Sequence, residues 1–451
     1  MSNSVYITHK NQLIEHLEQG SKPAASWRIG TENEQLIFQN KTLQRAPYEG
    51  LSGIAKVLES FENNGWQPIY DRNKIIAVKK NQASITLEPA GQFELSGAPL
   101  KNIHECAEEL NSYHTELYGY LQDLDLSLFS QGMDPKTARE HMPWMPKQRY
   151  AIMKRYMPTR GNHGLDMMTA TTTVQTNLDY GSEADLGLKF KVSMALQPII
   201  TGMFANSPLR HGQLNGFKSY RAHIWQDTDP DRCGLLPFAF EEPFSFEKYV
   251  DYILDVPMYF VYRDGVYMDH AGHSFRDFMQ GNLPGMEGQL PLMQDFTDHM
   301  TTAFPEVRIK QYIEMRGADS GPKEHINALS ALWTGLLYDA DTLMETYQWI
   351  KEWRHDECKQ LLLRTAQHGT QTIFQEKPLH VFIQKILELA TQGLNRRNVL
   401  NANNQDESIY LDYLKELNKN NQCPADRSID IFRQNSHLHI DEYLTHFLHT
   451  V

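Results

Sequence analysis

The feature that most constrains the fold is an alternating stretch between Pro305 and Gly317. Apolar residues in this stretch alternate with charged or polar neighbours; the apolar positions are Val307, Ile309, Ile313 and Met315. A period of two is the signature of a strand with one buried face, whereas a helix would spread these side chains around its circumference. Proline and glycine bracket the run as breakers. We therefore expect one strand here, with Glu314 and Arg316 on the same face about 7 Å apart.

Pairs of polar side chains on one strand face recur elsewhere in the chain. The other pairs are Glu32 with Glu34, Glu88 with Glu94, and Gln175 with Asn177. Like-charged neighbours repel, and a buried amide costs free energy unless it is hydrogen-bonded. Each pair alone also fits a solvated surface or, for the amides, a side-chain ladder. Their recurrence favours a polar cavity.

The segment that carries Glu88 and Glu94 is interrupted by Pro89 and Gly91. Neither residue fits the middle of a regular ladder, so we expect a bulged or bent edge strand. Residues 324–399 are predicted to form successive helices. Strands with polar faces followed by a helical part make the chain α+β.

Composition excludes several classes of protein. The formal net charge of −13 argues against non-specific nucleic-acid binding, because no basic stripe offsets it. No run of about 18 apolar residues is present, and the first residues lack the regions of a signal peptide. We therefore expect neither a nucleic-acid partner nor a membrane. An anionic substrate would need locally placed cations or metal ions.

Cysteine and histidine usage gives no metal-binding pattern. The four cysteines are far apart with no CxxC, which is typical of reduced thiols. Four histidines lie near the C-terminus: His437, His439, His446 and His449. No thiol or carboxylate accompanies them at a diagnostic spacing, so we interpret them as a solvated helix face.

The candidate cavity would be rich in carboxylates. Its acidic candidates are Glu32, Glu34, Glu88, Glu94 and Glu314, joined by Gln175, Asn177, Arg221 and Arg316. Five carboxylates cannot share a dry cavity without cations, because repulsion would protonate some of them. Oxygen ligands suit Mg²⁺ or Mn²⁺ better than zinc. Such metal ions together with arginines form a clamp for a transferring phosphoryl group.

Seven motifs, in order along the chain, resemble the plant and proteobacterial type of glutamate–cysteine ligase. They are LEPAGQFELSG (87–97), GLDMM (164–168), VQTNLD (174–179), FANSP (204–208), RAHIWQDTD (221–229), DVPMYFVYR (255–263) and YIEMRGAD (312–319). The resemblance extends from about residue 28 to 340.

The resemblance implies a fold and a reaction. The fold is like that of glutamine synthetase: a curved, mainly antiparallel sheet that forms a funnel-shaped active site, flanked by helices. Residues 1–350 would form the catalytic domain, and residues 351–451 a mainly helical part packed on it. The reaction joins the γ-carboxylate of L-glutamate to the amine of L-cysteine with ATP hydrolysed to ADP and phosphate, the first step of glutathione synthesis. Mg²⁺ is the expected metal, with Mn²⁺ as a possible substitute. From the reduced cysteines and the missing signal peptide we expect a cytoplasmic protein, and a monomer or homodimer.

The resemblance also assigns roles to residues. The expected Mg²⁺ ligands are Glu32, Glu34, Glu88, Glu94, Gln175 and Glu314. Arg316 would be the phosphate-side cation, and Arg221 would contact the α-carboxylate of glutamate. Asn177 and Trp225 would be further members of the substrate pocket.

Two alternatives remain at this stage. One is a related ATP-dependent carboxylate–amine ligase with another amine acceptor; the other is a non-catalytic binding protein with the same fold. The resembled plant enzymes are controlled by disulfides. Cys106 matches one of the plant cysteines, but Asn327, His270 and Gly285 stand at the other three positions. Redox control through those bridges is therefore not expected.

Overall fold

The computed structural model describes residues 5–241, 243–434 and 439–448. Its centre is an antiparallel sheet in the order β14-β15-β7-β1-β5-β4-β3-β2, with β6 paired to the far end of β1. The strands of this sheet are β1 (Ile29–Gln39), β2 (Gln67–Asp71), β3 (Lys74–Lys80), β4 (Ala83–Leu87), β5 (Phe93–Ser96), β6 (Leu126–Phe129), β7 (Thr173–Leu178), β14 (Val307–Ile309) and β15 (Ile313–Asp319). The two outer strands, β14 and β2, do not pair with each other, so the sheet is open and does not close into a barrel.

Smaller strand pairs surround this sheet. They are β8 (Leu209–Arg210) with β9 (Gln213–Leu214), β10 (Cys233–Gly234) with β13 (Phe304–Pro305), β11 (Phe260–Arg263) with β12 (Val266–Asp269), and β16 (Ile373–Phe374) with β17 (Lys377–Pro378). Among these pairs, β10 and β13 run parallel.

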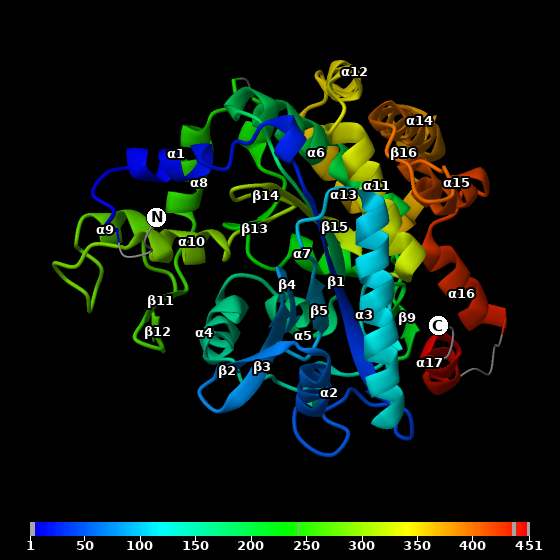
Figure 1. Ribbon diagram of the computed structural model, residues 1–451, viewed down its shortest axis with the longest axis horizontal. Helices are drawn as coiled ribbons and strands as arrows, with labels where there is room; N and C mark the ends of the chain where they lie inside the picture. The colour runs from blue at the N-terminus through cyan, green and yellow to red at the C-terminus, as the bar shows by residue number, and fades with distance from the viewer. Residues whose placement is uncertain (1–4, 242, 435–438, 449–451) are drawn as a thin grey trace.

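Helices enclose the sheet and form the C-terminal flank (Figure 1). The α-helices are α1 (Asn11–Glu18), α2 (Ile54–Phe61), α3 (Ile103–Asp123), α4 (Gln148–Tyr156), α5 (Gly164–Ala170), α6 (Glu183–Met203), α7 (Tyr220–Gln226), α8 (Phe246–Asp255), α9 (Phe275–Met279), α10 (Met293–Met300), α11 (Lys323–Leu337), α12 (Ala340–Ile350), α13 (His355–His368), α14 (Leu379–Arg397), α15 (Asp412–Lys419), α16 (Pro424–Gln434) and α17 (Ile440–Leu448). The 3₁₀ turns are η1 (Ala24–Ser26), η2 (Glu62–Asn64), η3 (Arg139–His141), η4 (Met157–Thr159), η5 (Pro237–Phe240), η6 (Gly369–Gln371) and η7 (Glu407–Leu411).

The strand β1 shows why the sheet has one polar face. Burial alternates along its first half: Thr31, Asn33 and Gln35 are buried, and Glu32 and Glu34 are half-buried. The buried side faces α3 and α11, which pack against the sheet, and α3 runs alongside β1 in Figure 1. The face that carries the glutamates is therefore turned away from these two helices.

Two expectations about strands are wrong. The stretch from Val307 to Met315 is a hairpin in which β14 pairs antiparallel with β15, because the chain turns at residues 310–312. The strand that carries Glu94 is not an edge, because β5 lies between β1 and β4. Its irregular residues 88–92 form the turn that joins β4 to β5, so Pro89 and Gly91 lie outside the ladder.

The C-terminal helices contact the core through two glycines. Gly335 of α11 and Gly393 of α14 face each other so closely that a Cβ at Gly335 would overlap the backbone of Ala390, and one at Gly393 would overlap the carbonyl oxygen of Gly335. Figure 1 shows α14 to α17 on one flank of the molecule. This contact joins residues on both sides of position 350, and the domain division at that position stays a prediction.

Replacing Gly335 with alanine is expected to lower the free energy of unfolding by roughly 1–3 kcal/mol, because the methyl group would force two helix backbones apart. Gly119 of α3 is the matched control, since nothing lies within 4 Å of a Cβ built there. Gly119→Ala is expected to raise the same free energy by about 0.5–1 kcal/mol through helix propensity. Denaturant unfolding measures both. A shift of the same sign in the two variants would contradict the packing argument.

Three further observations concern membrane spans, cysteines and histidines. Within the described residues, no helix is long and apolar enough to cross a membrane. The four cysteines are free thiols. His439 and His446 are exposed, and His437 and His449 lie outside the described residues.

Candidate active site

The predicted polar pairs lie on one face of adjacent strands. In the register of the sheet, Glu34 is opposite Glu94, Glu32 is opposite Gln175, and Asn177 is opposite Glu314. Directly opposed residues in antiparallel strands point to the same side of the sheet. The structure therefore brings the candidates of β5, β1, β7 and β15 together on one polar surface of the sheet, which we call the floor of the candidate site.

The β15 end of this floor is cationic around one fully buried carboxylate. Glu314 Oε2 accepts hydrogen bonds from Arg308 Nε at 2.5 Å and Arg316 Nη1 at 3.2 Å. Its other oxygen accepts from Arg308 Nη2 at 3.0 Å and Lys310 Nζ at 3.4 Å. Burial alone would raise the pKa of Glu314, but these three cations hold that pKa well below its usual value. Glu314 is therefore ionised and fixes two arginines.

The amides of β7 link this end to β1. Glu32 accepts a hydrogen bond on each carboxylate oxygen, from Asn177 Nδ2 at 2.7 Å and Gln175 Nε2 at 3.1 Å. Gln175 Oε1 in turn accepts from Arg316 Nη1 at 2.5 Å. The amides thus satisfy Glu32 and orient Arg316, which explains why polar side chains are buried on this strand.

The β5 end of the floor groups carboxyl side chains, and within the described residues no ion pair joins Glu34 or Glu94 to a cation. Burial, followed by the charge of Glu88, raises the pKa of Glu34 to about 8. Burial and the charges of Glu88, Glu32 and Glu34 raise the pKa of Glu94 well above its usual value. The hydrogen bonds to these groups are few: Thr173 N donates to Glu34 Oε2 at 3.1 Å, and the hydroxyl of Thr86 donates to Glu94 at 3.0 Å. Repulsion of this kind is relieved by a bound cation or by protons.

Two cations of α4 and the loop before it approach the same carboxylates. Burial, followed by the charge of Arg149, lowers the pKa of Lys147 to about 8, and the charges of Glu88 and Glu94 act in the opposite direction. Arg149 also interacts with Glu88. Both side chains are half-buried. They place positive charge opposite the acidic end of the floor.

Arg221 of α7 reaches the β15 end of the floor, where it contacts Arg316. It is 4 % exposed, its Nη2 donates to the carbonyl oxygen of Arg316 at 2.9 Å, and its Nε has no hydrogen-bond partner. Trp225 lies one turn further along the helix, with its ring centroid 5.8 Å from the guanidinium carbon. The indole Nε1 is also buried without a partner. Arg221 and Trp225 therefore each hold one buried donor that has no hydrogen-bond partner among the described residues.

The expected metal ligands lie near one face of the sheet, but the described residues do not form a convergent metal-binding group. Within the described ranges, no group of three or more His, Cys, Asp or Glu side chains is arranged to hold a metal ion. The ligand roles of Glu32, Glu34, Glu88, Glu94, Gln175 and Glu314 stay predictions, as do the roles of Arg221, Arg316, Asn177 and Trp225. The donor set and the raised pKa values of Glu34 and Glu94 fit a hard cation with oxygen ligands.

Sequence reasoning missed four cations of the candidate site: Arg308, Lys310, Lys147 and Arg149. The first two lie opposite or beside Glu314 only because the chain turns into a hairpin, and a single-strand interpretation cannot show that pairing. The other two belong to a basic segment that starts at the Pro–Met loop before α4. A cluster of positive charge in an acidic chain was the signal that could have pointed to Lys147 and Arg149 as site residues.

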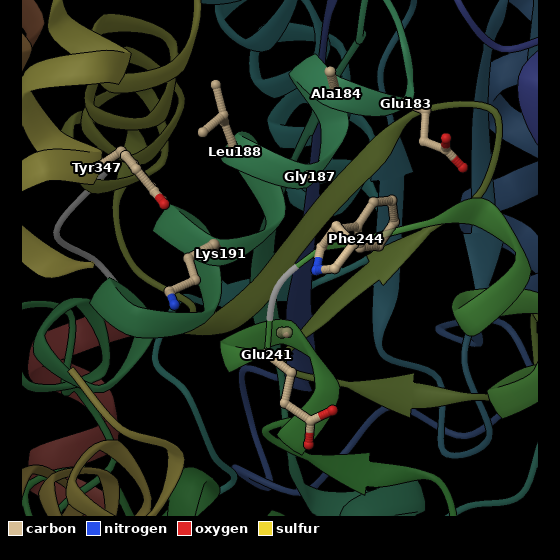
Figure 2. A pocket seen from close by; sticks show the side chains of 10 residues that line it. Glu183, Ala184, Gly187, Leu188, Lys191, Glu241, Phe244 and Tyr347 are labelled. Atoms are coloured by element: carbon tan, nitrogen blue, oxygen red, sulfur yellow. The ribbon is translucent and has the colours of Figure 1, made fainter. Parts of the chain in front are cut away.

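A separate pocket of about 290 Å³ lies between α6 and α12. Figure 2 shows Ala184, Leu188 and Lys191 of α6 and Tyr347 of α12 around it, with Phe244 opposite. The amino group of Lys191 donates to the carbonyl oxygen of Phe240 at 3.1 Å. None of the predicted site residues lines this pocket, so the pocket is distinct from the candidate active site.

Comparison with known proteins shows the family to which the chain belongs. The model of glutamate-cysteine ligase family 2 matches residues 28–446. The chain is 44 % identical over 424 residues to a chloroplastic glutamate–cysteine ligase of Medicago truncatula, covering 94 % of this chain and 82 % of the relative. It is 43 % identical to the chloroplastic enzyme of Arabidopsis thaliana over 424 residues, covering 94 % and 80 %.

Solved structures confirm the fold. The glutamate–cysteine ligase of Francisella tularensis in complex with AMP aligns with a TM-score of 0.56 at 12 % identity, covering 95 % of this chain and 88 % of that one. A bifunctional glutathione synthetase of Pasteurella multocida aligns with a TM-score of 0.53 at 13 % identity, covering 98 % and 54 %. The glutamine-synthetase-like ligase fold expected from the sequence is therefore present, with an open antiparallel sheet.

The expectation of a cytoplasmic location is wrong. The curated relatives from Medicago truncatula, rice and Arabidopsis thaliana are all named as chloroplastic enzymes. Reduced cysteines and ordinary composition fit any reducing compartment, so they never distinguished the cytoplasm from a plastid. By its family model and by its identity to these relatives over nearly its whole length, the chain belongs to glutamate-cysteine ligase family 2.

Proposed function

We propose that this chain is a glutamate–cysteine ligase that joins the γ-carboxylate of glutamate to the amine of cysteine with ATP as cosubstrate, the first step of glutathione biosynthesis. The identity to glutamate–cysteine ligases over 94 % of the chain supports this reaction. The observation that carries the chemistry is the polarised floor, with Glu34 and Glu94 at one end and Arg316 and Arg308 at the other. Such a floor suits a reaction that moves a phosphoryl group between anions.

The reaction requires an activated carboxylate. Glutamate's γ-carboxylate attacks the γ-phosphate of ATP to give γ-glutamyl phosphate and ADP, and the cysteine amine then attacks the acyl carbon and expels phosphate. In this mechanism Arg316, held by Gln175 and Glu314, neutralises charge on the transferring oxygens. Arg221 binds the α-carboxylate of glutamate, and Asn177 and Trp225 line the same pocket.

A divalent cation belongs to this proposal. The carboxylates of Glu32, Glu34, Glu88 and Glu94, with Gln175, would hold Mg²⁺, and Mn²⁺ could replace it. When bound, the metal supplies positive charge that offsets the charge of the ATP phosphates. Glu314 is part of the expected ligand set, and its oxygens are engaged by Arg308, Lys310 and Arg316. Glu314 could therefore coordinate the metal only if Arg308, Lys310 or Arg316 moved away from its carboxylate.

The experiment that tests the function measures ADP release with Mg²⁺, ATP and glutamate, with and without a panel of amines, together with product mass. We expect release that depends on cysteine and a γ-linked Glu-Cys product. Release that depends on a different amine would keep the chemistry and change the substrate. No release with any amine would overturn the proposal. The expected monomer or homodimer stays a prediction, tested by sedimentation.

Mg²⁺ binding is expected to release protons at neutral pH and to tighten as the pH rises towards about 8, because Glu34 with a pKa of about 8 is largely protonated until a cation displaces its proton. Calorimetry in two buffers with different ionisation enthalpies measures this release. Glu34→Gln is expected to reduce it. Identical binding heats in both buffers, with an affinity independent of pH, would contradict the prediction.

The same raised pKa affects the stability of the cation-free protein. The unfolded carboxyl ionises near its ordinary pKa of 4.5 and the folded one at about 8, so the folded state binds more protons between these values. The free energy of unfolding therefore falls as the pH rises through this window. Saturating Mg²⁺ is expected to remove most of this dependence.

A further inference from the structure

Asp319, the last residue of β15, is a buried carboxylate that the mechanism does not use. It is 1 % exposed, and no ion pair joins it to a cation in the described part of the chain. Three donors satisfy it instead. Asn206 N donates to Oδ2 at 2.8 Å, the hydroxyl of Ser207 to Oδ2 at 2.7 Å, and the hydroxyl of Ser219 to Oδ1 at 2.7 Å.

The hydroxyls of Ser207 and Ser219 also accept hydrogen bonds from the start of α7. Ser207 Oγ accepts from Arg221 N at 3.1 Å, and Ser219, the N-cap of α7, accepts from Ala222 N at 3.0 Å. Each serine thus donates to Asp319 and accepts from a backbone N–H of the first turn. Both carboxylate oxygens of Asp319 accept hydrogen bonds from these serines, and the serines in turn bind the backbone of the first turn of α7. We infer that Asp319 thereby fixes the rotation of this turn about the helix axis.

The direction of the Arg221 side chain depends on this turn. Of its guanidinium nitrogens, Nη2 has one hydrogen bond, to the carbonyl oxygen of Arg316, and Nε has none. Among the described residues, no carboxylate forms an ion pair with this guanidinium, although the charges of Asp319, Glu306 and Glu34 all act on it. Asp319 itself is packed closely against Gly132, since a Cβ built at Gly132 would overlap it. The backbone of the first turn of α7 and the nearby charge of Asp319 therefore both contribute to the position of Arg221.

We propose that Asp319 is a positioning residue for substrate binding: through Ser207 and Ser219 it holds the first turn of α7 so that Arg221 meets the α-carboxylate of glutamate. The inference rests on the proposed function for the identity of that ligand. It assigns a role to the aspartate of the YIEMRGAD motif and the serine of the FANSP motif, which the expected ligand set leaves unexplained.

The primary test is Asp319→Asn. The amide has the same size, but one of its ends donates where the carboxylate accepts, so it cannot keep all three hydrogen bonds. We expect KM for glutamate to rise about tenfold or more, with KM for ATP within about twofold and kcat within about threefold of the unmodified protein. In an Arg221→Ala background the same substitution is expected to add less than about twofold, because its effect passes through Arg221. If Asp319→Asn raised KM for glutamate by the same factor with and without Arg221→Ala, the proposal would be overturned.

Ser219→Ala with Ser245→Ala provides a matched pair of controls. Both serines are N-caps, and Ser245 caps α8 by accepting from Lys248 N at 3.2 Å. Both variants are expected to lose thermal stability through the missing cap, and Ser219→Ala is expected to lose more, because it also removes a donor to buried Asp319. Only Ser219→Ala is expected to raise KM for glutamate; an equal change in both, or in neither, would contradict the positioning role.

A structural measurement separates this inference from the proposed function. If the unmodified chain forms no γ-glutamylcysteine, the proposed function fails, and the crystal structure of the Asp319→Asn or Ser219→Ala variant still tests the positioning. A displaced Arg221 guanidinium that has lost its contact with the Arg316 carbonyl supports the inference. An unmoved guanidinium overturns it, whatever the activity.

Discussion

Replacing Arg316 with alanine is expected to lower kcat by roughly 10³-fold, the range in which a positioned donor or arginine acts on developing charge. Arg316 is held at two points, by Gln175 Oε1 at 2.5 Å and Glu314 Oε2 at 3.2 Å. This geometry exists before substrate binds, so little reorganisation accompanies the reaction. The loss is expected in kcat more than in KM, because the charge that Arg316 neutralises develops during phosphoryl transfer.

Initial rates of ADP release at saturating ATP, glutamate and cysteine measure this effect, and circular dichroism checks the fold. Arg276→Ala is the matched control, since Arg276 also pairs with carboxylates, Asp251 and Asp255, but on the surface. We expect this control to keep its turnover. Near-normal kcat in folded Arg316→Ala would remove Arg316 from the mechanism.

Replacing Glu34 with glutamine is expected to lower turnover by at least about 100-fold, because several kcal/mol of transition-state stabilisation come from a correctly held metal ion. The affinity for Mg²⁺ is expected to fall with it. The thermal midpoint of the cation-free protein at about pH 8 is expected to stay the same or rise, since the substitution removes the burial of a charge and its repulsion by Glu88, the two causes that raise the pKa of Glu34. Lower activity with equal or higher stability is the mark of a functional charge.

Kinetics over a Mg²⁺ series, with thermal unfolding in its absence, tests this prediction. Glu109→Gln is the control. Burial raises the pKa of Glu109 as well, but its carboxylate accepts from Ala98 N at 2.9 Å, away from the predicted ligand set. A Glu34→Gln variant with unchanged Mg²⁺ affinity would show that Glu34 is not a ligand.

The sequence predicts the residues on the floor of the site better than the cations that surround them. Alternation along β1 and β7 fixes which face each side chain occupies, so Glu32, Glu34 and Gln175 could be placed on one surface before their register was known. The partners of Glu314 could not be predicted, because the apolar positions before and after the turn at residues 310–312 fit one common period of two. Gln311 is the one polar residue at an apolar position of that pattern, and a single exception is a weak signal for a turn.

The position of β5 shows a second limit. Pro89 and Gly91 correctly indicate an interruption, but a bulge at an edge and a turn between two paired strands give the same local signal. Only the neighbours distinguish them, and β1 lies more than fifty residues earlier in the chain. Lys147 and Arg149 are set by similar long-range contacts, since α4 reaches the acidic end of the floor through tertiary packing.

The strand order also has a consequence for synthesis of the chain. The strand β7 pairs with β1 on one side and with β15 on the other, and the contact between Gln175 and Arg316 joins residues 141 positions apart. A growing chain therefore carries β7 with one unpaired edge until β15 has been made. Exposed edges of this kind recruit other strands. We expect aggregation to compete with folding most strongly in nascent chains that end between these two strands.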